Sequence, residues 1–356
     1  MKTSHQESVV GPVSGSLRTA RRHCARARLT TRIALTTLTL AAALAIPLGA
    51  GVGIAAAQSF PTKPIRLIVP WAPGGISDTS ARLLAQHISA STGQPVIVEN
   101  RPGAGSTLGS ELVARSPADG HTLLYADITT TAINATAYVK LPYDTLRDFS
   151  SVTTVGASPL FLVAHPSIPA KDVRELVALA NAKPGALNYA SAGVGSTLHL
   201  AAELFRDAAN VNIVHVPFKG AGHAMGSLLS GEVALIFSAS PPILPHVKRA
   251  ALRALATTKP TRSNVLPEVP ALAEVYPGFQ IAIVNGVLGP ARLPQDRVER
   301  LQAEISKAAQ IPEVRKRFES LGMEVRTSSA AELTAFLKSE MGRFGKLIRE
   351  AGIRLE

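Results

Sequence analysis

Short apolar runs alternate with longer amphipathic segments along most of this chain, and this alternation constrains the fold more than any other feature. Runs of this length are typical of buried strands, and the spacing between them is typical of helices. Repeated strand–helix units predict an α/β protein with largely parallel sheets. The predicted strands are 65–69, 96–99, 122–126, 160–164, 188–191, 213–216, 233–237, 251–256 and 281–288. The clearest predicted helices are 79–92, 105–115, 173–182, 197–208, 221–230, 295–309, 311–320 and 330–351.

The first predicted strand runs into a Pro73-Gly74-Gly75 turn that opens a helix. Adjacent glycines let the backbone approach a ligand, and the unpaired N–H groups of a first helical turn favour an anion such as a carboxylate. A tight turn between strand and helix explains the same residues without a ligand. Asp78 has two interpretations as well: an acid that stabilises the helix start, or a group that tunes specificity through a ligand hydroxyl, an amine or water.

A second loop follows the predicted strand 188–191 and has the same construction. Its glycines and hydroxyls precede an amphipathic helix, so it also predicts hydrogen-bond donors at a helix start. The alternative is that Ser196 or Thr197 only caps the helix and that His199 makes local hydrogen bonds. Two such loops on different parts of the chain favour a binding site. The candidates in this loop are Ser191, Gly193, Ser196, Thr197 and His199.

The N-terminal 57 residues predict a cleaved secretory signal peptide. Six arginines between positions 18 and 32 precede an apolar run over 33–46, and Ala55-Ala56-Ala57 provides small residues for cleavage. A retained membrane anchor is the weaker interpretation, because the apolar run is interrupted and no stop-transfer charges follow it. Cleavage after Ala57 would leave 299 residues in an extracytoplasmic, periplasmic compartment.

The composition of residues 58–356 excludes several classes of function. The signal segment contains seven of the 37 basic and one of the 25 acidic residues, so 30 basic and 24 acidic residues remain, a net charge of +6. Aromatic residues make up only 4% of the chain and no basic run survives, so nucleic acid is not an expected partner. Cys24 is the only cysteine, which leaves no thiolate for catalysis, a disulfide or a metal.

Motifs for catalysis, cofactors and metals are not found. The glycines between Gly103 and Gly109 have the spacing G-x-G-x-x-x-G, which does not fit a dinucleotide fingerprint, and more simply shape a loop and allow close helix packing. The histidines lack metal-ligand spacing, and no nucleophile elbow is present. The sequence therefore predicts no enzyme activity, no cofactor and no metal.

The order of the predicted strands suggests two lobes, the first of them discontinuous. We expect lobe one to comprise 58–158 and 284–356 and lobe two 159–283, with two chain crossings and a cleft between them. Ligands of open α/β sheets bind beyond the carboxyl ends of the strands, so both lobes would direct their loops toward one site.

Six segments together resemble one known family, the Bug (Bordetella uptake gene) receptors, which are the extracytoplasmic solute-binding proteins of tripartite tricarboxylate transporters. The resemblance extends in order along essentially the whole chain after the signal peptide. It implies a two-lobed, periplasmic-binding-protein-like fold of type II and a cleft that closes over a small carboxylate. The segments are 61–66, 73–75 with Asp78, 99–105, 141–144, 189–199 and 215–220.

The resemblance also implies which residues bind the ligand. It adds Thr129 and Thr130 of a hydroxyl-rich segment to the two loops already described. Two departures from the family pattern are expected to change ligand preference: Ser238 stands where relatives have an aspartate, and Val284-Asn285 where they have an aromatic pair. The expected ligand-binding set is Pro73, Gly74, Gly75, Asp78, Thr129, Thr130, Ser191, Gly193, Ser196, Thr197, His199 and Ser238.

The leading functional interpretation is a monomeric receptor that captures a small organic acid and delivers it to the permease subunits of a tripartite tricarboxylate transporter. A periplasmic sensor that feeds a membrane signalling protein without transport needs the same cleft and is the alternative. An enzyme is the third hypothesis, and the motifs favour it least because they hold an anion rather than move protons.

Overall fold

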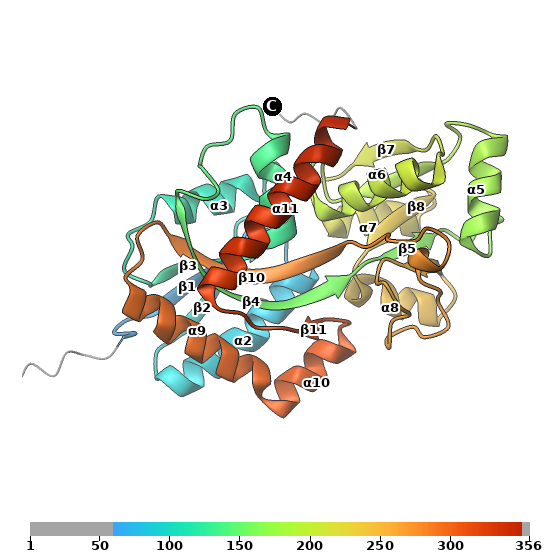
Figure 1. Ribbon diagram of the computed structural model, residues 1–356. Coiled ribbons are helices and arrows are strands. Elements are labelled where there is room, and N and C mark those ends of the chain that lie inside the picture. Colours follow the sequence, from blue (N-terminus) through green and yellow to red (C-terminus); the bar gives the residue numbers. More distant parts are fainter. Residues whose placement is uncertain (1–59, 351–356) are drawn as a thin grey trace, which may run out of the picture. The chain divides into compact units, whose positions relative to one another are not determined.

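The computed structural model describes residues 60–350, which form an α/β fold with two β-sheets (Figure 1). The predicted signal peptide (1–57) lies outside the described residues. The first sheet has the order β11-β4-β10-β3-β1-β2 and contains β1 (Ile65–Val69), β2 (Val96–Asn100), β3 (Thr122–Asp127), β4 (Phe149–Pro159), β10 (Ala282–Pro290) and β11 (Glu324–Val325). The second has the order β7-β6-β8-β5-β9 and contains β5 (Phe161–Ala164), β6 (Asn188–Ser191), β7 (Val214–Pro217), β8 (Leu235–Ser238) and β9 (Arg253–Thr257).

All eight helices predicted from the sequence are present in the described part of the chain. Helix α2 begins at Ile76, three residues before the predicted start, and α4 and α8 were not predicted. The α-helices are α2 (Ile76–Thr92), α3 (Thr107–Ala114), α4 (Ile128–Ala137), α5 (Val173–Ala182), α6 (Thr197–Ala209), α7 (Ala221–Leu229), α8 (Ser240–Lys248), α9 (Gln295–Gln310), α10 (Pro312–Ser320) and α11 (Ala330–Glu350). Two short 3₁₀ turns, η1 (Ala104–Ser106) and η2 (Leu272–Glu274), complete the described elements.

The prediction of largely parallel sheets is wrong, because both sheets are mixed. Strand β1 is parallel to β2 and β3, and β6 is parallel to β7 and β8. The pairs that involve β4, β5, β9, β10 or β11 are antiparallel. Strand β4 leaves the first sheet at the end where β10 returns to it, so these two neighbours run in opposite directions.

The chain passes twice between the two sheets. Only Leu160 separates β4 of the first sheet from β5 of the second, and residues 258–281 connect β9 to β10. We use "first lobe" and "second lobe" for the two sheets with their helices. The residue boundaries predicted for the lobes remain a prediction.

Five helices follow strands after connections of at most six residues, and their starts position the candidate site. Helices α2 and α4 follow β1 and β3 of the first sheet, whereas α6, α7 and α8 follow β6, β7 and β8 of the second. Strand β1 is anchored in the core, with Ile68 and Val69 fully buried. Rigid strands therefore present the starts of five helices. None of the helices within residues 60–350 is long and apolar enough to cross a membrane.

Candidate ligand-binding site

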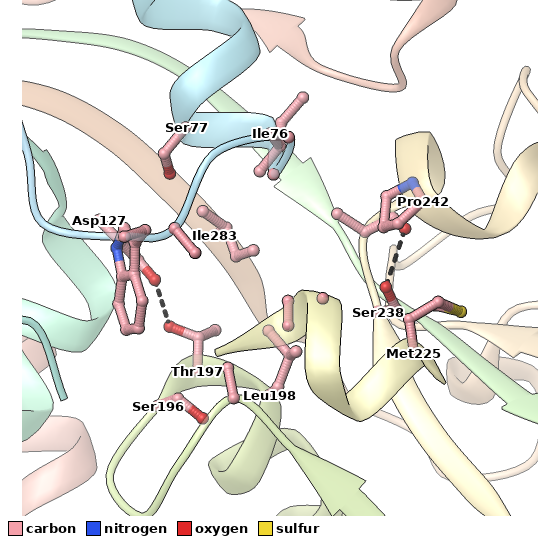
Figure 2. Close-up of a pocket in the computed structure, with 18 of the residues that line it drawn as sticks. Ile76, Ser77, Asp127, Ser196, Thr197, Leu198, Met225, Ser238, Pro242 and Ile283 are labelled. Carbon is pink, nitrogen blue, oxygen red and sulfur yellow. Dashed lines mark hydrogen bonds between the residues drawn. The ribbon is translucent and has the colours of Figure 1, made fainter. Parts of the chain in front are cut away.

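A cavity of about 280 Å³ lies where these five helices begin (Figure 2). Its lining comes from both lobes. The first lobe contributes Ile283 and the α2 loop, residues 70–75 between β1 and α2, and the second contributes the starts of α7 and α8 and of α6 with the α6 loop before it, residues 192–196. The lining residues are Trp71, Ala72, Pro73, Gly74, Gly75, Ile76, Ser77, Asp127, Thr130, Ala192, Ser196, Thr197, Leu198, Ala221, Gly222, Met225, Ser238, Ala239, Pro242 and Ile283.

The start of α2 presents backbone donors to this cavity. Its N-cap, Gly75, makes no side-chain cap hydrogen bond, and within residues 60–350 no acceptor lies in reach of the Ile76 and Ser77 N–H groups. Gly74 has φ +90°, a conformation that favours glycine, and a Cβ atom at Gly74 or Gly75 would meet no protein atom within 4 Å. The loop therefore offers unpaired donors at the positive end of a helix dipole, beside open space.

Asp78 does not line the cavity and instead holds the α2 loop in place. Its carboxylate accepts hydrogen bonds from the Gly74 N–H (3.0 Å), Arg82 Nε (3.0 Å) and Asn100 Nδ2 (2.9 Å). Burial acts to raise the pKa of Asp78, but the bonds from Arg82, Gly74 and Asn100 outweigh it and hold the pKa below its usual value. Asp78 therefore acts as a structural acid, which agrees with the first of the two interpretations from sequence.

Among the described residues that line the cavity, Asp127 has the only ionisable side chain. It caps α4 by accepting from the N–H groups of Thr129 and Thr130, and it also accepts from the hydroxyls of Thr130 and Thr197, both at 2.7 Å. Complete burial raises the pKa of Asp127 to about 6, because four neutral donors do not offset the loss of water. The bond to Thr197 also links β3 of the first lobe to α6 of the second (Figure 2).

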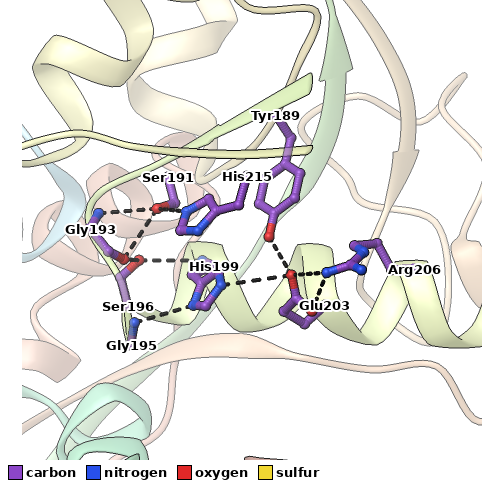
Figure 3. Close-up of polar contacts among 9 residues, drawn as sticks. All are labelled: Tyr189, Ser191, Gly193, Gly195, Ser196, His199, Glu203, Arg206 and His215. Carbon is purple, nitrogen blue, oxygen red and sulfur yellow. Dashed lines mark hydrogen bonds and ion pairs between the residues drawn. The ribbon is translucent and has the colours of Figure 1, made fainter. Parts of the chain in front are cut away.

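Two histidine rings support the α6 loop from behind (Figure 3). His199 Nδ1 accepts from the Gly195 N–H (3.2 Å), and His215 Nε2 lies 2.7 Å from Ser191 Oγ, which accepts from the Gly193 N–H. The two imidazole rings stack with centroids 4.1 Å apart. Burial lowers the pKa of His199 to about 4 and that of His215 to about 3, so both rings are neutral at pH 7.

The stack rests on a partly buried ion pair, in which Glu203 is buried and Arg206 is not. Glu203 lies 2.7 Å from Arg206, accepts a hydrogen bond from the Tyr189 hydroxyl and lies 3.7 Å from His199 Nε2. Burial acts to raise the pKa of Glu203, but Tyr189 and Arg206 outweigh it and keep the pKa low. The Tyr189 ring in turn stacks on His215, with centroids 4.8 Å apart. These contacts below the loop fix its backbone.

The structure brings seven of the twelve predicted site residues into the cavity lining. These are Pro73, Gly74, Gly75, Thr130, Ser196, Thr197 and Ser238. The other five do not line it. Asp78, Ser191, Gly193 and His199 hold the two loops from behind, and Thr129 donates its N–H to the N-cap Asp127 and its hydroxyl to the Ala282 carbonyl. Contact of any of the twelve with a ligand remains a prediction.

Several lining residues were missed from the sequence. Asp127 directly follows a predicted strand and precedes three threonines, a pattern typical of a helix N-cap that could have identified α4. Trp71 lies within the first loop, two residues before the predicted Pro73. Met225, Pro242 and Ile283 come from three separate segments, and no local signal connects them.

The site has donors suited to holding an anion. Among the described residues that line it, the donors are backbone N–H groups and hydroxyls, and none of the side chains is cationic. Among the described residues, no group of three or more histidine, cysteine, aspartate or glutamate side chains is placed to hold a metal ion. The glycines of the rejected dinucleotide pattern serve packing: a Cβ on Gly109 would lie 2.8 Å from Pro70 Cβ.

Known proteins resemble this chain over most of its length. The model for "Tripartite tricarboxylate transporter family receptor" matches residues 80–353. BugT of Bordetella pertussis is 36% identical over 303 residues, which cover 85% of this chain and 93% of BugT.

Solved structures of similar proteins have the same fold. The periplasmic binding protein BugD is 28% identical, with a TM-score of 0.78, and the match covers 83% of this chain and all of that one. The R. palustris protein Rpa4515, solved with adipate, is 30% identical, with a TM-score of 0.80, and the match covers 83% of this chain and 99% of that one. These similarities confirm the predicted two-lobed α/β fold class.

Proposed function

Because this chain belongs to the receptor family of tripartite tricarboxylate transporters, we propose that it captures a small carboxylate in the cavity and delivers it to a membrane permease of that transporter class. The convergence of uncapped helix starts on a cavity without cationic side chains is the observation that supports this proposal most strongly. Backbone donors in a closed site bind an anion well, because they need no reorganisation and compete little with water.

The proposal includes location, partner and chemistry. The protein acts in the periplasm as a monomer after removal of residues 1–57, and its partners are the ligand and the permease subunits. It performs no catalysis, since the only acid in the cavity is engaged by four hydrogen bonds. The adipate bound by Rpa4515 supports a small carboxylic acid as the ligand class.

Trp71 provides a direct test of binding. It lines the cavity and is the only tryptophan of the chain, so its emission reports on this site alone. We expect titration with a panel of carboxylic acids to change Trp71 fluorescence and to raise the unfolding temperature together. Ligand at 100 times its Kd stabilises a protein by about 2.7 kcal/mol. If neither the Trp71 fluorescence nor the unfolding temperature changes with any aliphatic or aromatic acid, the proposed function is refuted.

A side chain at Gly75 tests the location of the site. Gly75 has φ −75° and its Cβ would meet no protein atom, so Gly75→Val is expected to fold normally while its methyl groups occupy the ligand's space. We expect at least a tenfold loss of affinity, about 1.4 kcal/mol, in calorimetric titration. Gly342→Val is the matched control, because its Cβ is equally free and it lies in α11, outside the cavity lining. Unchanged affinity in folded Gly75→Val would place the ligand elsewhere.

A further inference from the structure

A second pocket lies within the first lobe, between the start of α11 and the paired strands β4 and β10, which α11 crosses in Figure 1. Its volume is about 230 Å³, against about 280 Å³ for the cavity. We call it the α11 pocket. Its lining residues are Thr154, Gly156, Ala157, Val284, Arg326, Thr327, Ser328, Glu332 and Phe336, and none of them lines the cavity.

Strand β10 separates the α11 pocket from the cavity. Ile283 lines the cavity and its neighbour Val284 lines the pocket, because successive side chains of a strand point to opposite faces of a sheet. Val284 and Phe336 are partly buried and pack against the hydrophobic cluster that contains Leu333 of α11. A molecule in the α11 pocket can therefore bury an apolar group without reaching the cavity.

The segment between β11 and α11 forms a fixed polar wall of this pocket. The Thr154 hydroxyl donates to the Arg326 carbonyl at 2.6 Å. The Ser328 N–H and carbonyl both bond to the Thr153 hydroxyl. Thr327 is thus held between two anchored residues, and within residues 60–350 neither its N–H nor its hydroxyl has a hydrogen-bond partner. Thr327 leaves two donors available beside the pocket.

The two charged side chains of the lining have opposite signs. Within residues 60–350 no carboxylate oxygen lies within 4.0 Å of the Arg326 guanidinium nitrogens. Glu332 accepts from the Ser329 N–H (2.8 Å) and hydroxyl (2.9 Å) with Oε2 alone, so in this part of the chain its Oε1 has no donor. The bonds from Ser329, with Arg326 nearby, hold the pKa of Glu332 below its usual value. The pocket therefore presents one cation and one anion at neutral pH.

A ligand with both charges fits this arrangement better than a ligand with one. A simple carboxylate can pair with Arg326 but is repelled by Glu332, and a simple amine can pair with Glu332 but is repelled by Arg326. A zwitterion pairs with both side chains. Few polar groups beside an apolar surface are typical of sites for small molecules.

We propose that the α11 pocket binds a free α-amino acid with an apolar side chain. Its carboxylate pairs with Arg326 and Thr327, its ammonium group pairs with Glu332, and its side chain packs against Phe336 and Val284. This site is separate from the carboxylate cavity and goes beyond the proposed function, because the protein would hold the amino acid here whether or not the cavity is filled.

Leucine and two truncated analogues test the chemistry on the purified protein, expressed as the full chain. Calorimetry on Gly75→Val, in which the cavity is obstructed, would compare leucine with 4-methylpentanoate, which lacks the ammonium group, and with 3-methylbutylamine, which lacks the carboxylate. We expect leucine to bind at least about tenfold more tightly than either analogue, the effect of one hydrogen bond to a charged group. Equal binding of either analogue, or no binding of leucine, overturns the inference.

Substitutions in the pocket test its location. We expect Arg326→Gln to weaken leucine binding at least about tenfold, and Glu332→Gln to do the same while it tightens the binding of 4-methylpentanoate, because the repelling charge is gone. The glutamine keeps an oxygen for the Ser329 donors. Arg174→Gln, at an exposed arginine of α5, is the matched control and should bind leucine as the native protein does.

The same variants distinguish the pocket from the cavity. We expect leucine affinity to be the same in Gly75→Val as in the native protein, because the two sites share no lining residue. Leucine binding that is unchanged in folded Arg326→Gln but lost in Gly75→Val would place leucine in the cavity. That result overturns this inference and leaves the receptor proposal standing.

Discussion

Two buried aspartates in this protein show how the partners of a carboxylate decide its charge. Asp78 faces the Arg82 guanidinium, which helps to keep its pKa below the usual value. Asp127 is equally buried but has only hydroxyl and amide donors, and burial raises its pKa to about 6. Asp78 is therefore a permanent anion that fixes a loop, whereas Asp127 titrates close to neutrality inside the cavity.

The titration of Asp127 predicts pH-dependent binding. An anionic ligand favours the protonated form of Asp127, so binding takes up a proton at any pH above about 6. We expect affinity to fall as pH rises through this value, by up to about tenfold per pH unit for one proton.

Asp127→Asn is the control for this prediction. The amide keeps an oxygen for the Thr129 and Thr130 N–H groups, and the threonine hydroxyls can rotate to accept from its NH₂. Calorimetry across pH 5 to 8 should show a flat profile for the variant. If the affinity of Asp127→Asn still falls as pH rises, the proton is taken up by another group.

At the scale of elements, the α6 loop depends on two neutral histidines. His199 must remain unprotonated at Nδ1 to accept from Gly195, and protonation of either stacked ring would place a charge in a buried position. Their pKa values in the folded protein, about 4 and about 3, lie below the usual value of 6.5. Above pH 6.5 their contribution to stability is fully present, and it is lost as pH falls toward these folded values.

This linkage predicts acid sensitivity. At pH 5 each histidine is expected to lower the free energy of unfolding by on the order of 2 kcal/mol relative to pH 7, a shift of several degrees in Tm. His215→Phe keeps the ring stack and removes one titrating group, so it should retain more of its pH 7 stability at pH 5 than the native protein does. His223→Phe, at an exposed histidine, is the control. Equal acid sensitivity in all three proteins would contradict this assignment.

The sequence predicted most elements because their apolar patterns are local. Strands β1 and β6 begin and end where predicted, and α5 matches residue for residue. Strand β4 was not predicted because five of its eleven residues are serine or threonine, which interrupts the apolar pattern. Their hydroxyls pair with the distant segment at Arg326 and Ser328, which no local pattern indicates.

Helices α4 and α8 escaped prediction for different reasons. Helix α4 is buried on nearly all sides and rich in threonine, so it lacks an amphipathic stripe. Helix α8 contains three prolines, two of them in its first turn and one, Pro245, in its interior. The donor loops of the site could be predicted because glycines and hydroxyls mark them locally. The apolar residues of the lining could not, because only the tertiary fold brings Met225, Pro242 and Ile283 together.

At the scale of the whole molecule, the two lobes share a polar contact beside the cavity. Thr130 of the first lobe and Thr197 of the second have hydroxyl oxygens 2.9 Å apart, and the Thr197 N–H donates to Thr130 Oγ1. Because Thr130 and Thr197 lie on different lobes, a receptor that closes over its ligand would bring them together only in its closed form. The lone native cysteine, Cys24, lies in the predicted signal peptide, so a new pair of cysteines would have no competitor.

A reversible crosslink tests closure. We expect oxidised Thr130→Cys/Thr197→Cys, formed with ligand present, to release that ligand at least about tenfold more slowly than the reduced form, because the exit requires the lobes to part. Addition of a reductant should restore the original release rate. Each single variant under the same oxidant is the control. Equal release rates from the oxidised and reduced double variant would contradict closure at this contact.

Because no cationic side chain lines the cavity in the described part of the chain, we expect ligand affinity to depend little on salt. An anion held by exposed lysines or arginines loses affinity as salt rises, since mobile ions screen the pair. Here the attraction comes from peptide dipoles at helix starts, so mobile ions have no side-chain ion pair to screen. We expect the Kd to change less than about twofold between low and seawater-like ionic strength in calorimetric titration. The fraction of receptor with ligand bound would then depend on ligand concentration in the same way in fresh and in salty surroundings.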